Sequence, residues 1–250
     1  MIDYKLFTSE GKREINEDRA GIALHDDSYC FAVADGLGGH GNGEIAAQAA
    51  IDAVCELFVE EGYSNEFFEH AFVAAQRSII AEQDRMSSPS KMKTTLVVLV
   101  IKDKKAIWAH VGDTRLYWFK NNRLKVRTLD HSVPQMLAIS GEIKEKDIRH
   151  HPDRNRLMRV MGLHGETPNY DVSKEVKLSG ECSFLLCTDG FWELIEENEM
   201  ESDLKSCSTA ALWIEEMSDK VMQNGQGSEM DNFTAIAVRA KEKTLLERLI

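Results

Sequence analysis

Apolar runs alternate with polar stretches along the chain and predict where strands lie. Residues 28–34 ("SYCFAVA") and 94–101 ("TTLVVLVI") are short continuous apolar runs, the second rich in β-branched side chains, so both predict buried strands. The polar turn "KDKK" separates the second run from the apolar residues 106–112, and "RLYWF" follows. We therefore expect an antiparallel meander over residues 94–119.

A second spacing, with apolar residues three and four positions apart, predicts two long amphipathic helices over residues 43–60 and 65–84. The other elements expected from the pattern are short helices near 132–140 and 155–161, a strand at 182–187, helices near 190–222 and a last strand at 232–238. Strands gather toward both ends of the chain, and helices fall between them in pairs. This order is typical of an α+β fold and differs from the regular strand–helix alternation of a doubly wound sheet.

A glycine-rich loop, "VADGLGGHGNGE" at residues 33–44, raises the question of nucleotide binding. Residues 36–41 satisfy the G-x-G-x-x-G pattern of dinucleotide-binding turns. However, the helix predicted at 43–60 leads into another helix, and no strand pattern returns until about residue 94. Asp35 would also place a negative charge beside a pyrophosphate. These features disfavour a dinucleotide site, and the absence of a G-K-[ST] sequence after the loop excludes a P-loop.

The composition narrows the partners and the compartment. A formal net charge of −12 disfavours binding to nucleic acid or to an anionic membrane, since both are negatively charged. No apolar run approaches the roughly 20 residues of a membrane helix, and the N-terminal sequence lacks the layout of a signal peptide. The five cysteines include no C-x-x-C pair, which disfavours zinc and predicts reduced thiols. We therefore expect a cytoplasmic protein.

Carboxylates recur at the ends of the predicted strands. They are Glu17 and Asp18 before "AGIAL", Asp35 after "CFAVA", Asp113 after "AHVG", Asp189 after "FLLCT", and Asp231 before "FTAIAV". Each one alone is also typical of a turn, where Asp and Asp-Gly pairs are frequent. If the strand ends converge, the like charges share a small volume and raise one another's pKa. Mg²⁺ or Mn²⁺ relieves that repulsion and prefers oxygen ligands, so the pattern favours a divalent-metal site.

At this point the sequence resembles a known family. The motifs that carry the resemblance are "REINEDR" (13–19), "VADGLGGHGNGEIAA" (33–47), "KTTLVVL" (93–99), "VGDTRLY" (111–117), "LDHSVPQ" (129–135), "CTDGFWE" (187–193) and "DNFTAI" (231–236). They are similar, in the same order, to those of metal-dependent serine/threonine phosphatases of type 2C, the PPM family, in its compact bacterial form. The resemblance runs from about residue 5 to 240. It implies an α-β-β-α sandwich of two antiparallel sheets flanked by helix pairs, with metals at one end.

The resemblance also implies roles for individual residues. Matched to the family motifs, Asp35, Asp189 and Asp231 are the direct carboxylate ligands of a binuclear centre, and the Gly36 carbonyl is a further ligand. Glu17 and Asp18 match the acidic pair that acts largely through metal-bound water. Asp113 matches the position that binds a third metal, and Arg13 matches the arginine that binds the phosphate. Asp35 and Asp189, with Arg13, are thus the expected catalytic residues. Two tightly bound Mn²⁺ or Mg²⁺ ions are implied, and the third ion stays open.

The implied reaction is hydrolysis of phosphoserine and phosphothreonine by a metal-bridged water. The expected substrates are phosphoproteins of a cognate serine/threonine kinase, and the expected protein is a monomer. We expect a single catalytic domain over residues 1–240 and a short helical tail over 241–250. Two alternatives remain: a catalytically inactive pseudophosphatase that acts as a binding module, and a phosphatase dedicated to a single regulatory phosphoprotein.

The chain departs from the family pattern in several places. Leu37 stands where eukaryotic members carry a histidine proposed as general acid, and Lys93 stands where the family usually has glycine. Thr114 and Thr188 replace common serines, which is conservative. The basic run at 149–159 resembles a phosphoprotein-binding patch, but we favour a structural role for its arginines.

Overall fold

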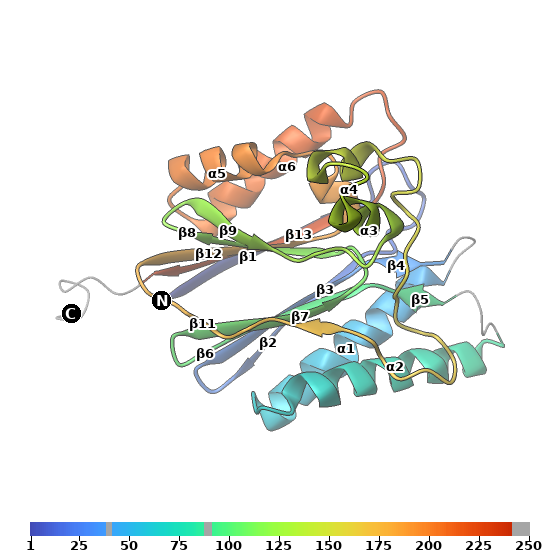
Figure 1. The fold of residues 1–250 in the computed structure, drawn as a ribbon. Helices are drawn as coiled ribbons and strands as arrows, with labels where there is room; N and C mark the ends of the chain where they lie inside the picture. The colour runs from blue at the N-terminus through green and yellow to red at the C-terminus, as the bar shows by residue number, and fades with distance from the viewer. Residues whose placement is uncertain (39–41, 88–91, 242–250) are drawn as a thin grey trace.

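Two sheets stacked face to face, with helices on both outer faces, make up the molecule (Figure 1). The structure is a computed structural model that describes residues 1–38, 42–87 and 92–241. It confirms the α+β class and the α-β-β-α sandwich. Within the described residues, none of the helices combines the length and the apolar character needed to cross a membrane.

The first sheet has five strands, and all neighbouring strands are antiparallel. Its order is β1 (Ile2–Ser9), β13 (Phe233–Lys241), β12 (Glu181–Cys187), β8 (Arg115–Lys120) and β9 (Arg123–Arg127). β1 and β13 pair along the length of β1, so the first and last described strands lie side by side within one sheet.

The second sheet has six strands and is also antiparallel. Its order is β10 (Asp171–Val172), β7 (Lys105–Val111), β6 (Leu96–Lys102), β3 (Ser28–Ala34) and β2 (Arg19–His25), and β11 (Val176–Lys177) also pairs with β7. A separate two-stranded pair joins β4 (Gly36–Leu37) to β5 (Lys93–Thr94). Because neighbouring strands are antiparallel throughout, the described residues contain no β-α-β unit, and the dinucleotide fold is excluded.

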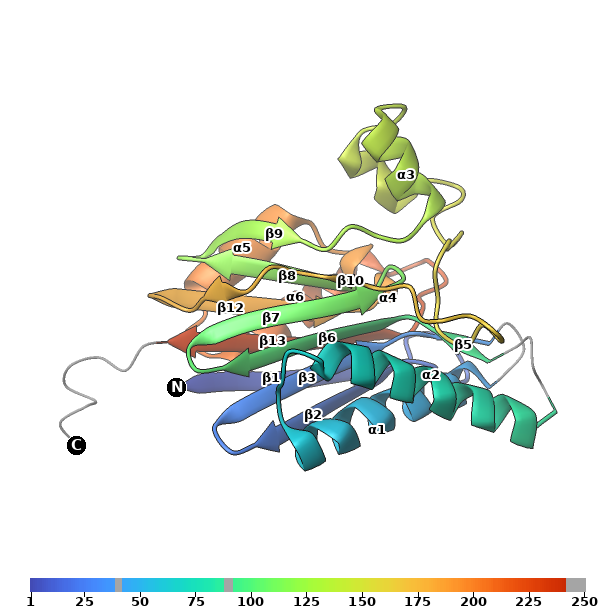
Figure 2. The same cartoon turned by 60° about the horizontal axis from the view of Figure 1, so that its bottom comes forward.

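Helix pairs cover the outer faces. The helices are α1 (Gly43–Glu61) and α2 (Phe67–Arg85) on the second sheet, α5 (Glu197–Ser206) and α6 (Ala210–Asn224) on the first, and the shorter α3 (Val133–Ser140), α4 (Asp189–Trp192) and 3-10 helix η1 (Glu145–His150). Figure 2 shows α3 standing away from the sheets. Its ends are set by local chemistry, since Ser132 accepts a hydrogen bond from the backbone N–H of Gln135 and Gly141 ends the helix in the left-handed region, with φ of 82°.

Three apolar clusters hold the layers together. One lies between the second sheet and α1 and α2, one lies between the first sheet and α5 and α6, and the third lies between the two sheets. β3 contributes to two of them, because Phe31 and Val33 face the other sheet while Cys30, Ala32 and Ala34 face the helices. Burial on both faces explains why this strand is apolar throughout.

Most of the expected elements are confirmed. The strand at 28–34 is β3, the two long helices are α1 and α2, the strand at 182–187 lies within β12, and the last strand is β13.

The expected meander over 94–119 is wrong in its last step. β6 and β7 pair as an antiparallel hairpin in the second sheet, but β8 belongs to the first sheet, where it pairs with β12 and β9. The chain crosses from one sheet to the other at Gly112, whose φ of 95° lies in the left-handed region and favours glycine.

The helix expected at 155–161 is also wrong. Leu157, Met158 and Met161 have helical spacing, yet this segment is irregular, with a turn that ends at Asn155 and isolated bridges of Ser132 with Leu157 and of Thr94 with Met161. Backbone pairing to two distant segments therefore overrides the local pattern.

Two expectations fall outside the described residues. The tail expected at 241–250 is described only at Lys241, and residues 39–41 of the glycine-rich loop are likewise outside the description.

Candidate functional site

The register of both sheets brings the carboxylate-bearing segments to one end of the sandwich. Ala34 at the end of β3 pairs with Arg19 at the start of β2. In the other sheet, Cys187 at the end of β12 pairs with Arg115 at the start of β8 and with Ala235 near the start of β13. The acidic residues next to these strand ends are Glu17, Asp18, Asp35, Asp113, Asp189 and Asp231.

These carboxylates lie close enough to repel one another. Burial raises the pKa of Asp35 well above its ordinary value, and the neighbouring carboxylates, Asp189 foremost, add to the rise. Burial and Asp189 likewise raise the pKa of Asp113. Burial raises the pKa of Asp18 to about 7 and that of Asp189 to about 6, even though hydrogen bonds to both groups lower it. The protein therefore holds a dense anionic cluster that a cation would stabilise.

Asp35 is held through its backbone at the junction of β3 and β4. Its N–H donates to Thr95 Oγ1 at 3.0 Å, and its carbonyl accepts from the Thr95 N–H at 2.9 Å and from Thr94 Oγ1 at 2.8 Å. These bonds fix where the strand ends and leave the carboxylate among its acidic neighbours.

Gly36 lies where the loop meets the start of α1. A Cβ at this position would lie 2.3 Å from the carbonyl oxygen of Gly43 and 2.7 Å from that of Glu17. The Gly36 N–H donates to the Glu17 carbonyl at 3.2 Å, and the Gly43 N–H donates to Glu17 Oε1 at 3.2 Å. Only glycine fits this close approach of backbone segments, and it places the acidic N-terminal loop against the helix start.

Asp18 and Glu17 are tied to the first sheet. Thr188 Oγ1 donates to Asp18 Oδ2 at 2.9 Å, directly before Asp189. Asn232 Oδ1 accepts from the Glu17 N–H at 2.8 Å, and its Nδ2 donates to two carbonyls of the same N-terminal loop. A segment that precedes β2 in the second sheet is thereby fixed to residues of the first sheet, which closes this end of the sandwich.

Arg13 lies at the exposed edge of the cluster. Its Nη2 contacts Asp231 Oδ2 at 2.8 Å, and 56% of its side chain is exposed. The structure thus places a guanidinium beside an expected metal ligand and in reach of solvent.

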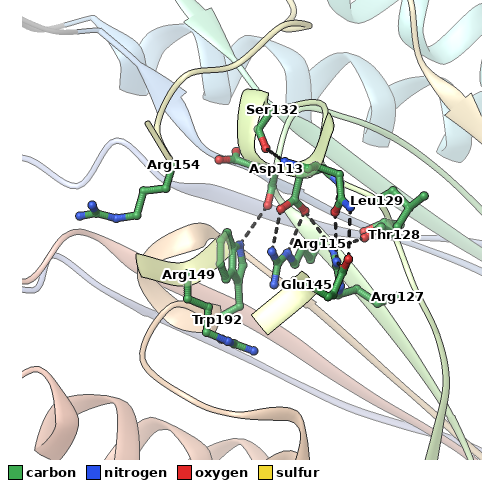
Figure 3. Close-up of polar contacts among 12 residues, drawn as sticks. Asp113, Arg115, Arg127, Thr128, Leu129, Ser132, Glu145, Arg149, Arg154 and Trp192 are labelled. Carbon is green, nitrogen blue, oxygen red and sulfur yellow. Dashed lines mark hydrogen bonds and ion pairs between the residues drawn. The ribbon is translucent and has the colours of Figure 1, made fainter. Parts of the chain in front are cut away.

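Asp113 is buried in the crossover between β7 and β8. Its carbonyl accepts a hydrogen bond of 3.0 Å from Trp192 Nε1 (Figure 3). Lys93 lies opposite Leu37 in the β4–β5 pair, so these two of the departures from the family pattern share one short ladder.

The donor set suits hard divalent cations. Carboxylates dominate it, several have raised pKa values because of burial and mutual repulsion, and neither histidine nor cysteine stands among them. Mg²⁺ and Mn²⁺ prefer such oxygen ligands. Fold and site together define an enzyme of the antiparallel sandwich type with an anionic, cation-demanding centre at the strand ends.

Three of the four arginines of the basic run make ion pairs with acidic residues of the chain. Arg149 contacts Glu197 at 2.6 Å, Arg154 contacts Glu193 at 2.9 Å, and Arg159 contacts Asp171 at 3.1 Å. These contacts agree with the structural role favoured from the sequence. Arg154 lies beside α4, and burial and Asp189 raise the pKa of its partner Glu193 to about 7.

A second polar cluster lies beside the crossover. His110 and His131 stack with ring centroids 4.7 Å apart, and His131 Nε2 lies 3.2 Å from Asp171 Oδ2. His131 Nδ1 accepts from the Gly112 N–H, and the His110 ring bonds the Leu129 carbonyl. The ligand atoms of His110, His131 and Asp171 lie within 4.8 Å of one another, but the ring nitrogens already bond the chain's own groups, so the cluster holds the crossover in place.

Sequence reasoning missed the supporting residues Asn232, Thr188 and Trp192. Asn232 follows an expected ligand directly, which was a usable signal. The partners of Thr188 and Trp192 are 170 and 79 residues away, and no local pattern reports such pairs.

Comparison with known proteins identifies the family. The sequence profile of protein phosphatase 2C matches residues 9–225. The serine/threonine phosphatase stp of Listeria welshimeri is 30% identical over 249 residues, which cover 96% of each chain. The chain belongs to the protein phosphatase 2C family and is a metal-dependent phosphatase.

Solved structures agree in fold. Stp1 of Staphylococcus aureus superposes with a TM-score of 0.87 at 24% identity and covers 97% of this chain and 96% of its own. The catalytic domain of PstP, solved in complex with two manganese ions, has a TM-score of 0.81 at 22% identity over 96% of this chain and 99% of its own.

Proposed function

We propose that this protein removes phosphate from phosphoserine and phosphothreonine in proteins at the acidic cluster. The observation that carries the proposal is the convergence of the strand-end carboxylates, whose pKa values burial and mutual repulsion raise. The stp relative is named a serine/threonine phosphatase, which supports the same substrate class here.

The proposed metal ligands follow the match to the family motifs, and the carboxylate-rich donor set agrees with them. We assign Asp35, Asp189 and Asp231, together with the Gly36 carbonyl, to two Mn²⁺ or Mg²⁺ ions, with Glu17 and Asp18 acting through water and Asp113 serving a third ion with Asp189. Two manganese ions in the PstP structure support the binuclear part. When bound, the ions would lower the pKa of a coordinated water and offset charge on the phosphoryl oxygens.

The chain's own residues orient the reactants. Arg13 can leave Asp231 and offer its planar fork of donors to two phosphoryl oxygens, since its side chain is exposed. Asp35 is fixed by Thr94 and Thr95, so its carboxylate holds its place while substrates exchange.

A covalent cysteine route is not supported. Cys30 and Cys187 are fully buried, and burial raises the pKa of both thiols. A buried, protonated thiol is a poor nucleophile, so direct hydrolysis agrees better with the site.

We further propose one catalytic domain over residues 1–240, with the tail at 241–250 outside it. The shared core between the sheets and the pairing of β1 with β13 support this assignment. We also propose that the protein acts as a monomer. The free cysteines agree with a cytoplasmic protein, and a cognate serine/threonine kinase would supply the phosphoprotein substrates.

The inactive binding module is not favoured, because every assigned carboxylate is present. The proposal is tested by phosphate release from matched phosphoserine, phosphothreonine and phosphotyrosine peptides with Mn²⁺, Mg²⁺ or EDTA. We expect turnover of the first two peptides with metal and none with EDTA. Equal turnover with EDTA, or preference for phosphotyrosine, would overturn it.

A further inference from the structure

We propose that Trp192 is a positioning residue for Asp113: its indole N–H holds the backbone of this acidic residue, and through it the weakest of the metal sites. The inference rests on the proposed function, in which Asp113 serves an additional divalent cation. It concerns a contact between α4 and the sheet crossover that lies outside the ligand set itself.

The contact lies where the chain crosses from one sheet to the other. Asp113 is in the crossover between the two sheets, one residue after Gly112, whose left-handed φ of 95° makes a sharp change of direction. Its carbonyl accepts from Trp192 Nε1 at 3.0 Å, and both residues are almost completely buried. A buried carbonyl that loses its donor is costly, so the segment would move to find another partner.

The same short helix carries both ends of the connection. α4 begins at Asp189, one of the assigned ligands, and ends at Trp192. Asp189 also raises the pKa of Asp113, so the two carboxylates interact electrostatically. A single turn of helix therefore sets the separation between two acidic groups that would share one cation.

The indole is itself held in place. The Arg115 guanidinium lies 3.3 Å from the centre of the Trp192 ring. Arg115 makes two parallel bonds to Asp130, of 2.8 and 2.6 Å, and a third to the Tyr117 hydroxyl at 3.0 Å. A bidentate, buried ion pair leaves Arg115 little freedom, and the cation–π contact passes that restraint to the indole.

This arrangement fixes the position of Asp113 before a cation binds. Ligands of a weakly bound cation must already be in place, because the ion does not contribute enough free energy to order them. Asp113 has no regular secondary structure to hold it, so the Trp192 bond supplies that order.

The test is Mn²⁺ binding to the metal-stripped protein, followed by electron paramagnetic resonance, with Trp192→Phe. Phe keeps an aromatic ring under Arg115 and removes the N–H together with part of the buried ring volume, and the same loss of volume occurs in the control variant below. We expect the weakest Mn²⁺ site to weaken by roughly five- to tenfold, as expected for loss of one buried hydrogen bond, with the tighter sites unchanged. The Mn²⁺ concentration for half-maximal turnover should rise by the same factor.

The matched control is Trp213→Phe. Trp213 is also buried, and its Nε1 donates to the Met200 carbonyl at 3.1 Å, within the core under α5 and α6. The chemical change is identical, but no acidic ligand is involved. Equal weakening of Mn²⁺ binding in both variants would show a general loss of packing and overturn the inference.

Asp113→Ala separates this inference from the proposed function. If Asp113→Ala leaves every Mn²⁺ site unchanged, the proposed third site fails and this inference fails with it. If Asp113→Ala removes the weakest site while Trp192→Phe changes nothing, only the positioning role is overturned. The Asp113→Ala, Trp192→Phe double variant should bind Mn²⁺ like Asp113→Ala alone.

A readout on the unmodified protein guards against a variant that folds poorly. The chain has four tryptophans, so its indole N–H resonances can be assigned one by one. During a Mg²⁺ titration the Trp192 resonance should shift with the weakest binding step, while the Trp213 resonance should not. An unresponsive Trp192 resonance would contradict the inference.

Discussion

At the scale of single residues, the site places groups of like charge together and restrains several of them through neighbours that carry no charge. Thr94 and Thr95 hold Asp35, Thr188 holds Asp18, and Asn232 holds the loop before β2. The acidic side chains repel one another, and the hydroxyl and amide groups keep them from moving apart. Because the carboxylates repel one another and cannot move apart, a bound cation stabilises the folded protein.

Replacing Asp35 with Asn tests whether the acidic side chains repel one another in the metal-free protein. Activity should fall by at least about a hundredfold, because a charged ligand becomes neutral at the centre of the site. The metal-free variant should melt higher than the wild type, because the mutual repulsion decreases, with about 2–4 °C for each kcal/mol gained. Turnover and thermal melting in EDTA measure the two effects.

Asp26→Asn is the control for this pair of measurements. Its carboxylate is 94% exposed in the turn after β2, and Asn accepts the left-handed φ of 50° found there. Neither activity nor melting should change. An Asp35→Asn protein that is folded and nearly fully active would remove Asp35 from the site.

Arg13→Ala should raise KM for a phosphothreonine peptide about tenfold, the effect of losing one charge-assisted contact, with Mn²⁺ binding unchanged. Steady-state kinetics at saturating Mn²⁺ measures this. The control is Lys12→Ala, whose exposed ammonium bonds only a carbonyl, that of Ser228 at 2.6 Å, among the contacts of the described residues. An unchanged KM in Arg13→Ala would contradict phosphate binding by this residue.

The sequence indicated the charged members of the site but not the residues that position them. Asp35, Asp189 and Asp231 could be predicted as site residues because each lies next to a predicted strand and within a motif that resembles the family's. The Trp192 and Thr188 contacts join segments far apart in the chain, and one sequence contains no periodic signal for such pairs. The roles assigned to the acidic residues and Arg13 stay predictions until the variants are measured.

At the scale of elements, the segment that carries α3 is joined to the sheets by buried ion pairs. Asp130 accepts from Arg115 and lies 3.3 Å from Arg127, and Arg127 also contacts Glu145 of η1 (Figure 3). The side chains of Arg115 and Asp130 are almost completely buried. Such a pair is costly to break on one side only, since the remaining charge stays buried.

Arg115→Met should therefore lower the free energy of unfolding by about 3–5 kcal/mol, as measured by urea denaturation. The Arg115→Met, Asp130→Leu double variant should recover most of the loss, because neither charge is left alone. Arg85→Met, in the exposed pair with Glu82, should leave the urea midpoint unchanged. If the double variant is no more stable than Arg115→Met alone, the loss of stability does not come from the unpaired, buried carboxylate of Asp130.

The periodicity of the sequence predicted which segments are strands and helices better than how they pair. β7 and β8 have the alternation of neighbouring hairpin strands, but the left-handed Gly112 sends β8 to the opposite sheet. The segment at 155–161 has helical spacing and is nevertheless irregular, with single bridges to distant segments at Leu157 and Met161. Met158 is 59% exposed, so the apolar spacing here does not mark the buried face of a helix.

At the scale of the whole molecule, the apolar core of the sandwich holds the acidic strand ends together. Their like charges repel one another when no cation is bound. The apolar layer between the sheets fixes the strand ends, and the strand ends fix the acidic segments. The stability of the metal-free protein should therefore depend on pH in an unusual direction.

In EDTA, the melting temperature should fall as the pH rises from 6.5 to 8. Unfolding releases Asp18, with pKa of about 7, and Glu193, also about 7, to the ordinary carboxyl range near 4. In this window the folded protein binds protons that the unfolded chain has lost, so stability decreases with pH. Burial lowers the pKa of His110 and His131, so their contribution has the opposite sign, but it ends in the lower part of this window, once the pH passes the ordinary histidine pKa of about 6.5.

Saturating Mn²⁺ should reverse the trend, since cations bind the ionised carboxylates and stabilise the folded state. Scanning calorimetry with and without Mn²⁺ at the two pH values provides the comparison. A melting temperature that rises with pH in EDTA would contradict the assigned electrostatics.

We propose above all that the strand-end carboxylates form the catalytic centre of a metal-dependent phosphoprotein phosphatase. Phosphate release from a phosphothreonine peptide by wild type and Asp35→Asn, each with Mn²⁺ and with EDTA, tests this proposal. We expect turnover only for wild type with Mn²⁺, with both proteins folded. Turnover by wild type in EDTA, or by Asp35→Asn at the wild-type rate, would contradict it.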